Sequence, residues 1–344
     1  MLLGRVRGIA LATARRNEVV TMTATSPFSV TGRMIAVIGS LALLAGCMGG
    51  GAGETTVPPS DNVSRVTGSS SGVYYSWMQP EIQAAWDQGY LGQGAQITII
   101  DDFTSDYTTF GWLTNKRQRL RHGEWVDLQA ALMAPDAARV TQDFDATQTV
   151  QLGAGMLNVL NLSYGMFAAN GLSNAQIAWT PRESSVITYA HNGAAVVVKS
   201  AGNHAIAVGG VNSSGEVDYL DRALIGADAA IFVGALVGHG TVANPTSLAS
   251  FSNFAGTDLT VQNQFLGVGV RDDLTGLNGT SFAAPIVSGY AAVIGSKFTT
   301  ATPVQITNQL LNTARTDTIL NYSAAVHGRG EASIAHALAP ASIN

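Results

Sequence analysis

The sequence predicts an α/β fold, a three-layer, doubly wound and mostly parallel sheet with helices on both faces. Apolar runs rich in β-branched residues recur along the chain, and they are continuous rather than alternating with polar residues. Continuous apolar strands are typical of a parallel sheet that is covered on both faces. Helical segments separate these runs, which is the pattern of α/β folds. The pattern begins near residue 74 and shows no internal repeat, so we expect one domain over residues 74–344.

Strands and helices are expected where the apolar periodicity changes along the chain. Short β-branched runs predict strands at residues 95–100, in the second half of 156–165, at 193–203 and at 229–236. Apolar residues at helical spacing predict helices at 76–94, 124–134, in the first half of 156–165, at 281–296 and at 302–314. In the first of these helices Trp77, Ile82 and Trp86 lie on one side, and glycines close the segment.

The composition excludes some partners. Of the 344 residues, 46% are hydrophobic, which is enough for a large core, and 12% are charged. The net charge is −5 and no basic stripe is present, which argues against a nucleic-acid partner. The one sizeable group of Lys and Arg residues spans 115–122, and we interpret it as a loop or a solvated face.

The N-terminal region predicts export and a lipid anchor. Arg33 precedes an apolar run from Met34 to Leu44, which is too short to span a bilayer and has the proportions of a signal-peptide core. The run ends in Leu-Ala-Gly-Cys, which resembles a bacterial lipobox whose cysteine, here Cys47, is diacylated and becomes the first mature residue. The alternative is a small buried cysteine in an N-terminal helix. Because the stretch ahead of the run is long, Met22 or Met34 is also a candidate start.

These observations divide the N-terminal region into two parts. Residues 1–46 are predicted to be a lipoprotein signal peptide, and residues 47–73 the acylated cysteine with a flexible Gly/Ser/Thr/Pro-rich tether. Because Cys47 is the single cysteine, the chain forms no intrachain disulfide. The expected location is the bacterial cell envelope, with the outer membrane expected in a Gram-negative cell and the leaflet left open.

Polar residues follow the predicted strands at the ends where sites lie in doubly wound sheets. Asp101 follows the run "ITII", Ser163 follows "LNVLNL", and Asn203 follows "VVVKSAG". His122 opens a predicted helix, whose dipole opposes its protonation. A histidine that acts as a base there needs a buried carboxylate to hold its tautomer, and Asp101 is the candidate. Ser281 stands directly before a helix rich in small residues.

The order Asp101, His122, Ser281 is that of subtilisin, and several motifs resemble the subtilisin-like (subtilase) serine proteases. "ITIIDD" resembles the family's aspartate strand, "HGEWV" its His-Gly-Thr-His-Val segment, and "LNLSYG" its substrate-cleft strand. "KSAGN" resembles the oxyanion-asparagine segment, and "SFSNF" a stretch upstream of the nucleophile. "NGTSFAAPIVSG" matches the nucleophile motif closely, and "GRGEASIAHAL" resembles the closing helix. The resemblance covers residues 74–342.

The resemblance implies a subtilisin-like fold and a serine endopeptidase with polypeptide substrates. It implies that Ser281 is the nucleophile, His122 the base, Asp101 its orienting carboxylate and Asn203 an oxyanion donor. It also implies that Ser163, Tyr164 and Gly165 line the substrate cleft. The mechanism needs no metal. The acidic groups Asp272-Asp273 and Glu216/Asp218/Asp221 are weak calcium candidates, and such groups are more often solvated loop charges. We expect a monomer.

Alternative interpretations remain for individual residues and for the whole chain. Asp102 competes with Asp101, and His239 sits in a decoy "GHGTV" that is out of order. His191, His204, His327 and His336 lie in no motif and are interpreted as surface or packing residues. Glu124-Trp125 replaces the family's Thr-His, which favours a catalytically inactive subtilase-fold lipoprotein acting as a binding or scaffold module. An α/β-hydrolase esterase requires Gly-x-Ser-x-Gly and the order Ser, Asp, His, which are absent around Ser281.

Overall fold

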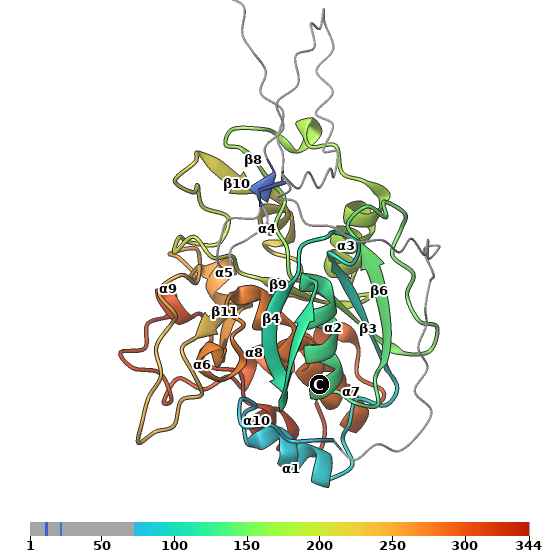
Figure 1. The fold of residues 1–344 in the computed structure, drawn as a ribbon, viewed down its shortest axis with the longest axis vertical. Helices are drawn as coiled ribbons and strands as arrows, with labels where there is room; N and C mark the ends of the chain where they lie inside the picture. The colour runs from blue at the N-terminus through green and yellow to red at the C-terminus, as the bar shows by residue number, and fades with distance from the viewer. Residues whose placement is uncertain (1–10, 13–20, 23–71, 344) are drawn as a thin grey trace, which may run out of the picture.

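A six-stranded sheet, parallel throughout, forms the centre of the molecule in the computed structural model, which describes residues 11–12, 21–22 and 72–343. The strand order is β12-β11-β9-β7-β3-β6. Figure 1 labels β3, β6, β9 and β11 of this sheet. The strands are β3 (Ala95–Asp101), β6 (Ala138–Asp143), β7 (Leu157–Leu162), β9 (Val196–Ser200), β11 (Ala230–Leu236) and β12 (Phe265–Gly269). The chain begins this sheet at β3 and then adds strands on both of its sides, so the winding direction reverses between β3 and β7. Clefts in such sheets open at this point of reversal, outside the carboxyl ends of the strands.

Helices cover both faces of the sheet, as the sequence predicts for a three-layer α/β fold. One apolar core lies between the sheet and α1, α2, α7, α8 and α10; a second lies between the sheet and α3, α4 and α5. The first set is α1 (Glu81–Asp87), α2 (His122–Met133), α7 (Ala284–Lys297), α8 (Pro303–Asn312) and α10 (Ile334–Leu338). The second set is α3 (Pro181–Asn192), α4 (Tyr219–Leu224) and α5 (Leu259–Gln264). Neighbouring residues of a strand enter opposite cores, as Val197 and Val198 of β9 do.

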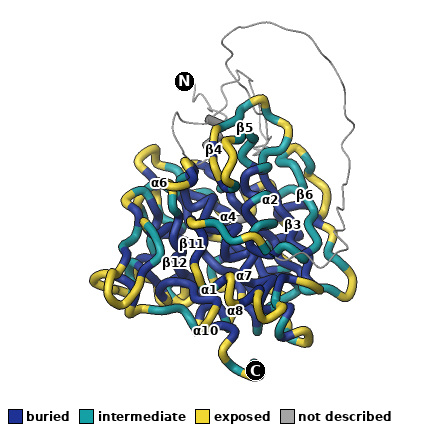
Figure 2. Tube along the Cα trace, turned by 60° about the horizontal axis from the view of Figure 1, so that its bottom comes forward, coloured by how far each residue is buried: buried dark blue, intermediate teal, exposed yellow. Residues whose placement is uncertain are grey.

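The central strands and α7 are buried along their length, which explains their continuous apolar sequence. In Figure 2 the segments labelled β11, β12 and α7 are mostly dark blue, the colour of buried residues. Helix α7 crosses against α2 closely, because a Cβ atom at Gly289 would lie 2.2 Å from Cβ of Met133. Only glycine fits at this contact, which joins the middle of α7 to the last residue of α2.

Smaller elements complete the fold. Two further antiparallel pairs join β4 (Thr109–Thr114) to β5 (Lys116–Leu120) and β8 (Phe167–Ala169) to β10 (Glu216–Asp218). A two-residue pair joins β1 (Leu11–Ala12) to β2 (Thr21–Met22). The short helices are η1 (Asn174–Gln176), α6 (Asp272–Thr275), η2 (Thr280–Phe282) and α9 (Ala324–His327). Among the described helices, none combines the length and the apolar character that crossing a bilayer requires.

Several predicted elements differ in the structure. The helical start at 156–165 was wrong, because β7 begins at Leu157 and bonds to β3 and β9 on its two sides. The helix predicted over 76–94 is limited to α1, since Pro80 stands at its start and Gly89 adopts a φ of 85° after its end. Strands β6 and β12 were not predicted: β6 is a half-buried, polar edge strand, and β12 has only five residues, two of them glycine.

Within the basic segment 115–122, residues 116–120 form the strand β5, so the predicted loop was wrong and the predicted solvated face is confirmed. β5 pairs with β4 as a hairpin, and Lys116, Arg117 and Arg119 are exposed. The guanidinium of Arg117 lies 3.9 Å from the ring centroid of Phe110, which is itself exposed. A cation over an aromatic face is a favourable contact, so the basic residues stabilise the hairpin that leads into α2.

Candidate active site

The sheet and α2 bring Asp101 and His122 into direct contact. Asp101 is the last residue of β3, and His122 is the first residue of α2. Nδ1 of His122 and Oδ1 of Asp101 are 2.6 Å apart. The Asp101 side chain is fully buried, whereas the His122 side chain is 27% exposed. Oδ1 of Asp101 also accepts a hydrogen bond from the backbone N–H of Asp102, which fixes the carboxylate. An imidazole bonded through Nδ1 to a buried carboxylate presents Nε2 for proton transfer.

Burial and the mutual charge of this pair set its proton affinities. Burial raises the pKa of Asp101 above its ordinary value, and the neighbouring His122 offsets part of that rise. Desolvation lowers the pKa of His122, but the charge and hydrogen bond of Asp101 raise it, and the net direction is upward from 6.5. An imidazole whose protonated form is favoured by a neighbouring carboxylate is suited to taking a proton during the reaction.

Residues around the start of α2 fix the position of His122. The Glu124 carboxylate accepts a hydrogen bond from the backbone N–H of Arg121 and pairs with the Arg121 guanidinium at 3.1 Å. The buried Trp125 donates its indole N–H to the carbonyl of Thr109 in the hairpin. Glu124 and Trp125, which depart from the family pattern, therefore cap the helix and dock the hairpin. Glu124 is not among the groups that shift the pKa of His122.

Ser281 lies in the 3₁₀ turn η2, immediately before α7, as expected for a serine at a helix start. Its side-chain hydroxyl donates to the carbonyl of Ser163 at 3.1 Å, and the Ser163 hydroxyl donates to the carbonyl of Ser281 at 2.9 Å. The next residue, Phe282, has its ring centroid 5.5 Å from that of His122. The turn thus lies beside the imidazole, while the Ser281 hydroxyl points to β7's end in this conformation.

Asn203 is held by Thr280, the residue before Ser281. Oδ1 of Asn203 accepts from both the backbone N–H and the hydroxyl of Thr280, at 2.8 and 2.9 Å. The Thr280 hydroxyl in turn accepts from the N–H of Gly202 at 3.0 Å. Gly279 adopts a φ of 119°, and a Cβ there would lie 3.2 Å from Nδ2 of Asn203. These contacts occupy the amide oxygen of Asn203, so its NH₂ group is the part oriented toward other partners.

A narrow crevice lies beside Ser281. Its lining residues are Ser163, Tyr164, Gly165, Phe167, Lys199, Ser200, Gly202, Asp218 and Ser281, and its volume is about 10 Å³. The three predicted substrate-binding residues, Ser163, Tyr164 and Gly165, therefore lie on one wall of a space that opens at Ser281. The structure brings these residues, Asp101, His122 and Asn203 to the carboxyl end of the sheet around Ser281.

Lys199 was missed by the sequence analysis, and two acidic residues were misinterpreted. Nζ of Lys199 lies 3.1 Å from Oδ2 of Asp218 and 3.1 Å from Oδ1 of Asp221. The two acidic side chains therefore contact a buried ammonium group rather than forming a calcium site with Glu216. In the described part of the chain, no group of three or more His, Cys, Asp or Glu residues is arranged to hold a metal. A single lysine inside an apolar strand run is the signal that could have indicated a buried lysine, although not which residues it pairs with.

The other candidates of the sequence analysis lie elsewhere. Asp102 bonds to Ser105 through its carboxylate, so Asp101 is the residue that contacts His122. His239 lies in the loop after β11, and its Nε2 bonds to the carbonyl of Trp77. Cys47 and the rest of the predicted signal peptide and tether lie outside the described residues.

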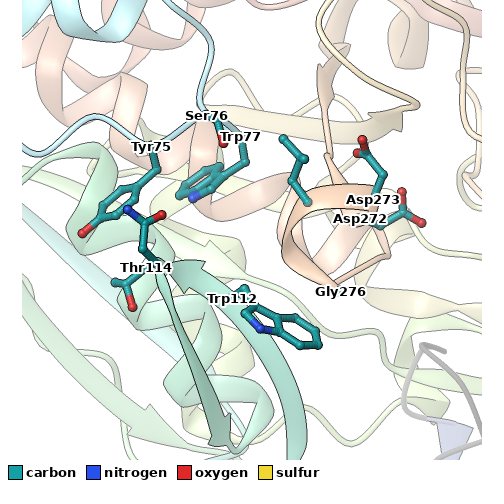
Figure 3. Close-up of a pocket in the computed structure, with 10 residues that line it drawn as sticks. Tyr75, Ser76, Trp77, Trp112, Thr114, Asp272, Asp273 and Gly276 are labelled. Atoms are coloured by element: carbon teal, nitrogen blue, oxygen red, sulfur yellow. The ribbon is translucent and has the colours of Figure 1, made fainter.

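A larger cavity, of about 450 Å³, lies between the hairpin tip, the segment Tyr75–Trp77 and α6 (Figure 3). Trp112, Thr114, Asp272 and Asp273 line it, and Asp273 pairs with Arg271 at 2.6 Å. None of its lining residues is a predicted catalytic residue. Its size alone therefore does not make it the reactive site.

Comparison with models of known protein families identifies the family of this chain. The model of the subtilase family matches residues 130–330, more than half of the chain. The chain belongs to the subtilase family. The matched range contains Asn203 and Ser281 and begins after Asp101 and His122. Membership of this subtilase family supports serine-type peptidase activity on polypeptides.

Two solved protease structures are similar to this chain. The prenylagaramide maturation protease PagA is 17% identical, with a TM-score of 0.50, and the match covers 76% of this chain and 98% of that one. A protease from Pseudoalteromonas arctica is 17% identical, with a TM-score of 0.49, covering 80% of this chain and 97% of that one. At 17% identity the likeness to PagA concerns the subtilisin-like fold alone. A search of curated proteins finds no match.

The contact between Asp101 and His122 predicts a measurable proton affinity. We expect the pKa of His122 to lie above 6.5 and to fall below it in Asp101→Asn, because desolvation then acts without the opposing carboxylate. Side-chain ¹⁵N NMR titration of the imidazole measures this value. Asp102→Asn is the matched control: it removes a charge that contributes less and should lower the pKa only slightly. Equal shifts in the two variants would contradict the assigned pairing.

Proposed function

We propose that this subtilase is a serine endopeptidase that uses Asp101, His122 and Ser281 as its triad and Asn203 as an oxyanion donor. The observation that carries the proposal is the 2.6 Å contact between the buried Asp101 carboxylate and His122, beside the turn that bears Ser281. A carboxylate, an imidazole and a hydroxyl in this relation are the parts needed for nucleophilic acyl transfer.

Each residue has one task in the proposed reaction. A rotation about the Cα–Cβ bond of Ser281 exchanges its hydrogen bond to Ser163 for one to Nε2 of His122. His122 then takes the hydroxyl proton as the oxygen attacks the peptide carbonyl, and it returns the proton to the leaving amine. Asp101 holds the Nδ1 proton and stabilises the imidazolium. Water hydrolyses the resulting acyl-enzyme by the same steps in reverse.

The oxyanion of the tetrahedral intermediate requires two donors. Nδ2 of Asn203 is suited to this task because Thr280 occupies the amide oxygen. The backbone N–H of Ser281 is the second donor proposed, since it lies at the start of a helical turn, where N–H groups lack partners within the helix. Removing one such donor typically costs about 3–4 kcal/mol in the transition state.

A catalytically inactive scaffold is the second candidate function. One observation favours it: the Ser281 hydroxyl bonds to Ser163 rather than to His122 in this conformation. In unliganded enzymes, catalytic hydrogen bonds are often long or poorly aligned and tighten only when substrate binds. The departure at Glu124 and Trp125 no longer favours the scaffold, because both residues support the position of His122.

A fluorophosphonate probe separates the two functions. The wild-type chain should form a covalent adduct, because the probe reports a serine activated by a base, and Ser281→Ala should form none. Mass spectrometry of the intact protein measures the adduct. Ser184→Ala, which removes an exposed serine of α3, is the control and should label like wild type. Folded wild-type protein that remains unlabelled supports the scaffold.

We further propose that Cys47 anchors the protein to a membrane of the bacterial cell envelope, on the lipobox resemblance described above. In a bacterial host, metabolic labelling with an alkynyl palmitate analogue should mark the wild-type chain and leave Cys47→Ser unlabelled. Cell fractionation should move the variant from the membrane to a soluble fraction. Equal labelling of both chains would remove the anchor from the account and leave the peptidase unaffected.

A further inference from the structure

The crevice beside Ser281 has room for very little. Its volume of about 10 Å³ is that of roughly one water molecule. Ser281 itself lines it, so the side chain next to an attacked carbonyl is the part of a substrate that reaches this space. Phe167 fills one side: a Cβ at Gly165 would lie 2.5 Å from the Phe167 ring.

Hydrogen bonds and an ion pair join two segments that line the crevice. Asp218 accepts a hydrogen bond through Oδ1 from the N–H of Met166, in the wall formed by residues 163–167, at 2.8 Å. Lys199 donates through Nζ to the carbonyl of Ser200, in a second segment that lines the crevice, residues 199–202, at 2.7 Å. The 3.1 Å contact between Nζ of Lys199 and Oδ2 of Asp218 joins the two walls.

Burial makes this tie hard to stretch. The Lys199 side chain is 1% exposed, and those of Asp218 and Asp221 are 6% and 2% exposed. Separating such a pair would leave a charge unpaired in a low-dielectric interior, which is strongly unfavourable. A large side chain that entered the crevice would have to spread the walls and break this pairing.

The same group of three offers no free charge to a substrate. Burial, and then the charge of Asp218, raise the pKa of Asp221 well above its ordinary value, so Asp221 tends to keep its proton. The negative charge of Asp218 and the positive charge of Lys199 then neutralise each other. A positively charged side chain would find its carboxylate already paired, and a negatively charged one would meet Asp218.

We propose that Lys199, braced by Asp218 and Asp221, is a specificity-determining residue that restricts the cleaved bond to those following a small, uncharged residue such as glycine, alanine or serine. This inference rests on the proposed peptidase function. It concerns the side chain that precedes the cleaved bond and leaves the rest of the substrate open.

Matched fluorogenic peptides that differ only in the residue before the cleaved bond test the restriction. With the full chain, kcat/KM for the alanine peptide should exceed that for the phenylalanine and lysine peptides by at least about tenfold, since pocket fit discriminates on this scale. A phenylalanine or lysine peptide cleaved as well as the alanine peptide would overturn the proposal.

Two variants test the physical cause. Lys199→Met removes the tie and leaves Asp218 unpaired, so the lysine peptide should gain at least about tenfold in kcat/KM relative to alanine as its ammonium takes the vacant place. Phe167→Ala widens the crevice and leaves the ion pair in place. It should raise kcat/KM for the phenylalanine peptide, relative to the alanine peptide, by a similar factor. Phe110→Ala, an exposed aromatic of the hairpin, should leave all ratios unchanged. If Lys199→Met does not fold, Phe167→Ala alone decides, and unchanged ratios there would refute the size limit.

Binding to Ser281→Ala separates this inference from the proposed function. Calorimetric titration of that variant with the same peptides should give the order alanine tighter than phenylalanine and lysine, whether or not the wild type cleaves them. If the wild type is not labelled by the fluorophosphonate probe but this binding order holds, the peptidase proposal fails and the crevice still selects a small side chain in binding. If the wild type is labelled but the binding order is reversed, the peptidase proposal stands and the size restriction fails.

Discussion

The contact between Asp101 and His122 is the constraint on which the rest of the site depends. It exists because β3 ends at Asp101 while the hairpin β4–β5 returns the chain so that α2 begins beside that strand end. Ser281 lies in η2 immediately before α7, and the ring of the next residue, Phe282, lies 5.5 Å from the His122 ring. A full carboxylate buried without a partner would be costly, so the imidazole both stabilises Asp101 and is oriented by it.

A second buried pairing fixes the opposite side of the site. Lys199 with Asp218 and Asp221 joins the end of β9 to the segment that follows β7, just as Asp101 with His122 joins β3 to α2. Two buried contacts between ionisable side chains, Asp101 with His122 and Lys199 with Asp218, therefore position the segments around the turn that bears Ser281. Such preorganisation suits chemistry in which donors must already be in place as charge develops.

Much of this arrangement could be predicted from the sequence, for identifiable reasons. Continuous apolar runs revealed β3, β9 and β11, and their polar end residues revealed Asp101 and Asn203. The pairing of Lys199 could not be predicted, because its partners arrive from β10 and α4, which are distant in sequence and too short to leave a periodic signal. The strand nature of 116–120 was missed because its side chains are exposed on a hairpin, where hydrophobic pattern is weak. The boundaries at residues 46 and 73 stay predictions.

The most direct test of the account is a crystal structure of the protein after reaction with diisopropyl fluorophosphate. The account predicts phosphorus bonded to Oγ of Ser281, with one phosphoryl oxygen at hydrogen-bonding distance from both Nδ2 of Asn203 and the backbone N–H of Ser281. His122 should remain bonded to Asp101 through Nδ1, with Nε2 facing the adduct. A phosphoryl oxygen directed away from Asn203, or an imidazole no longer bonded to Asp101, would contradict it.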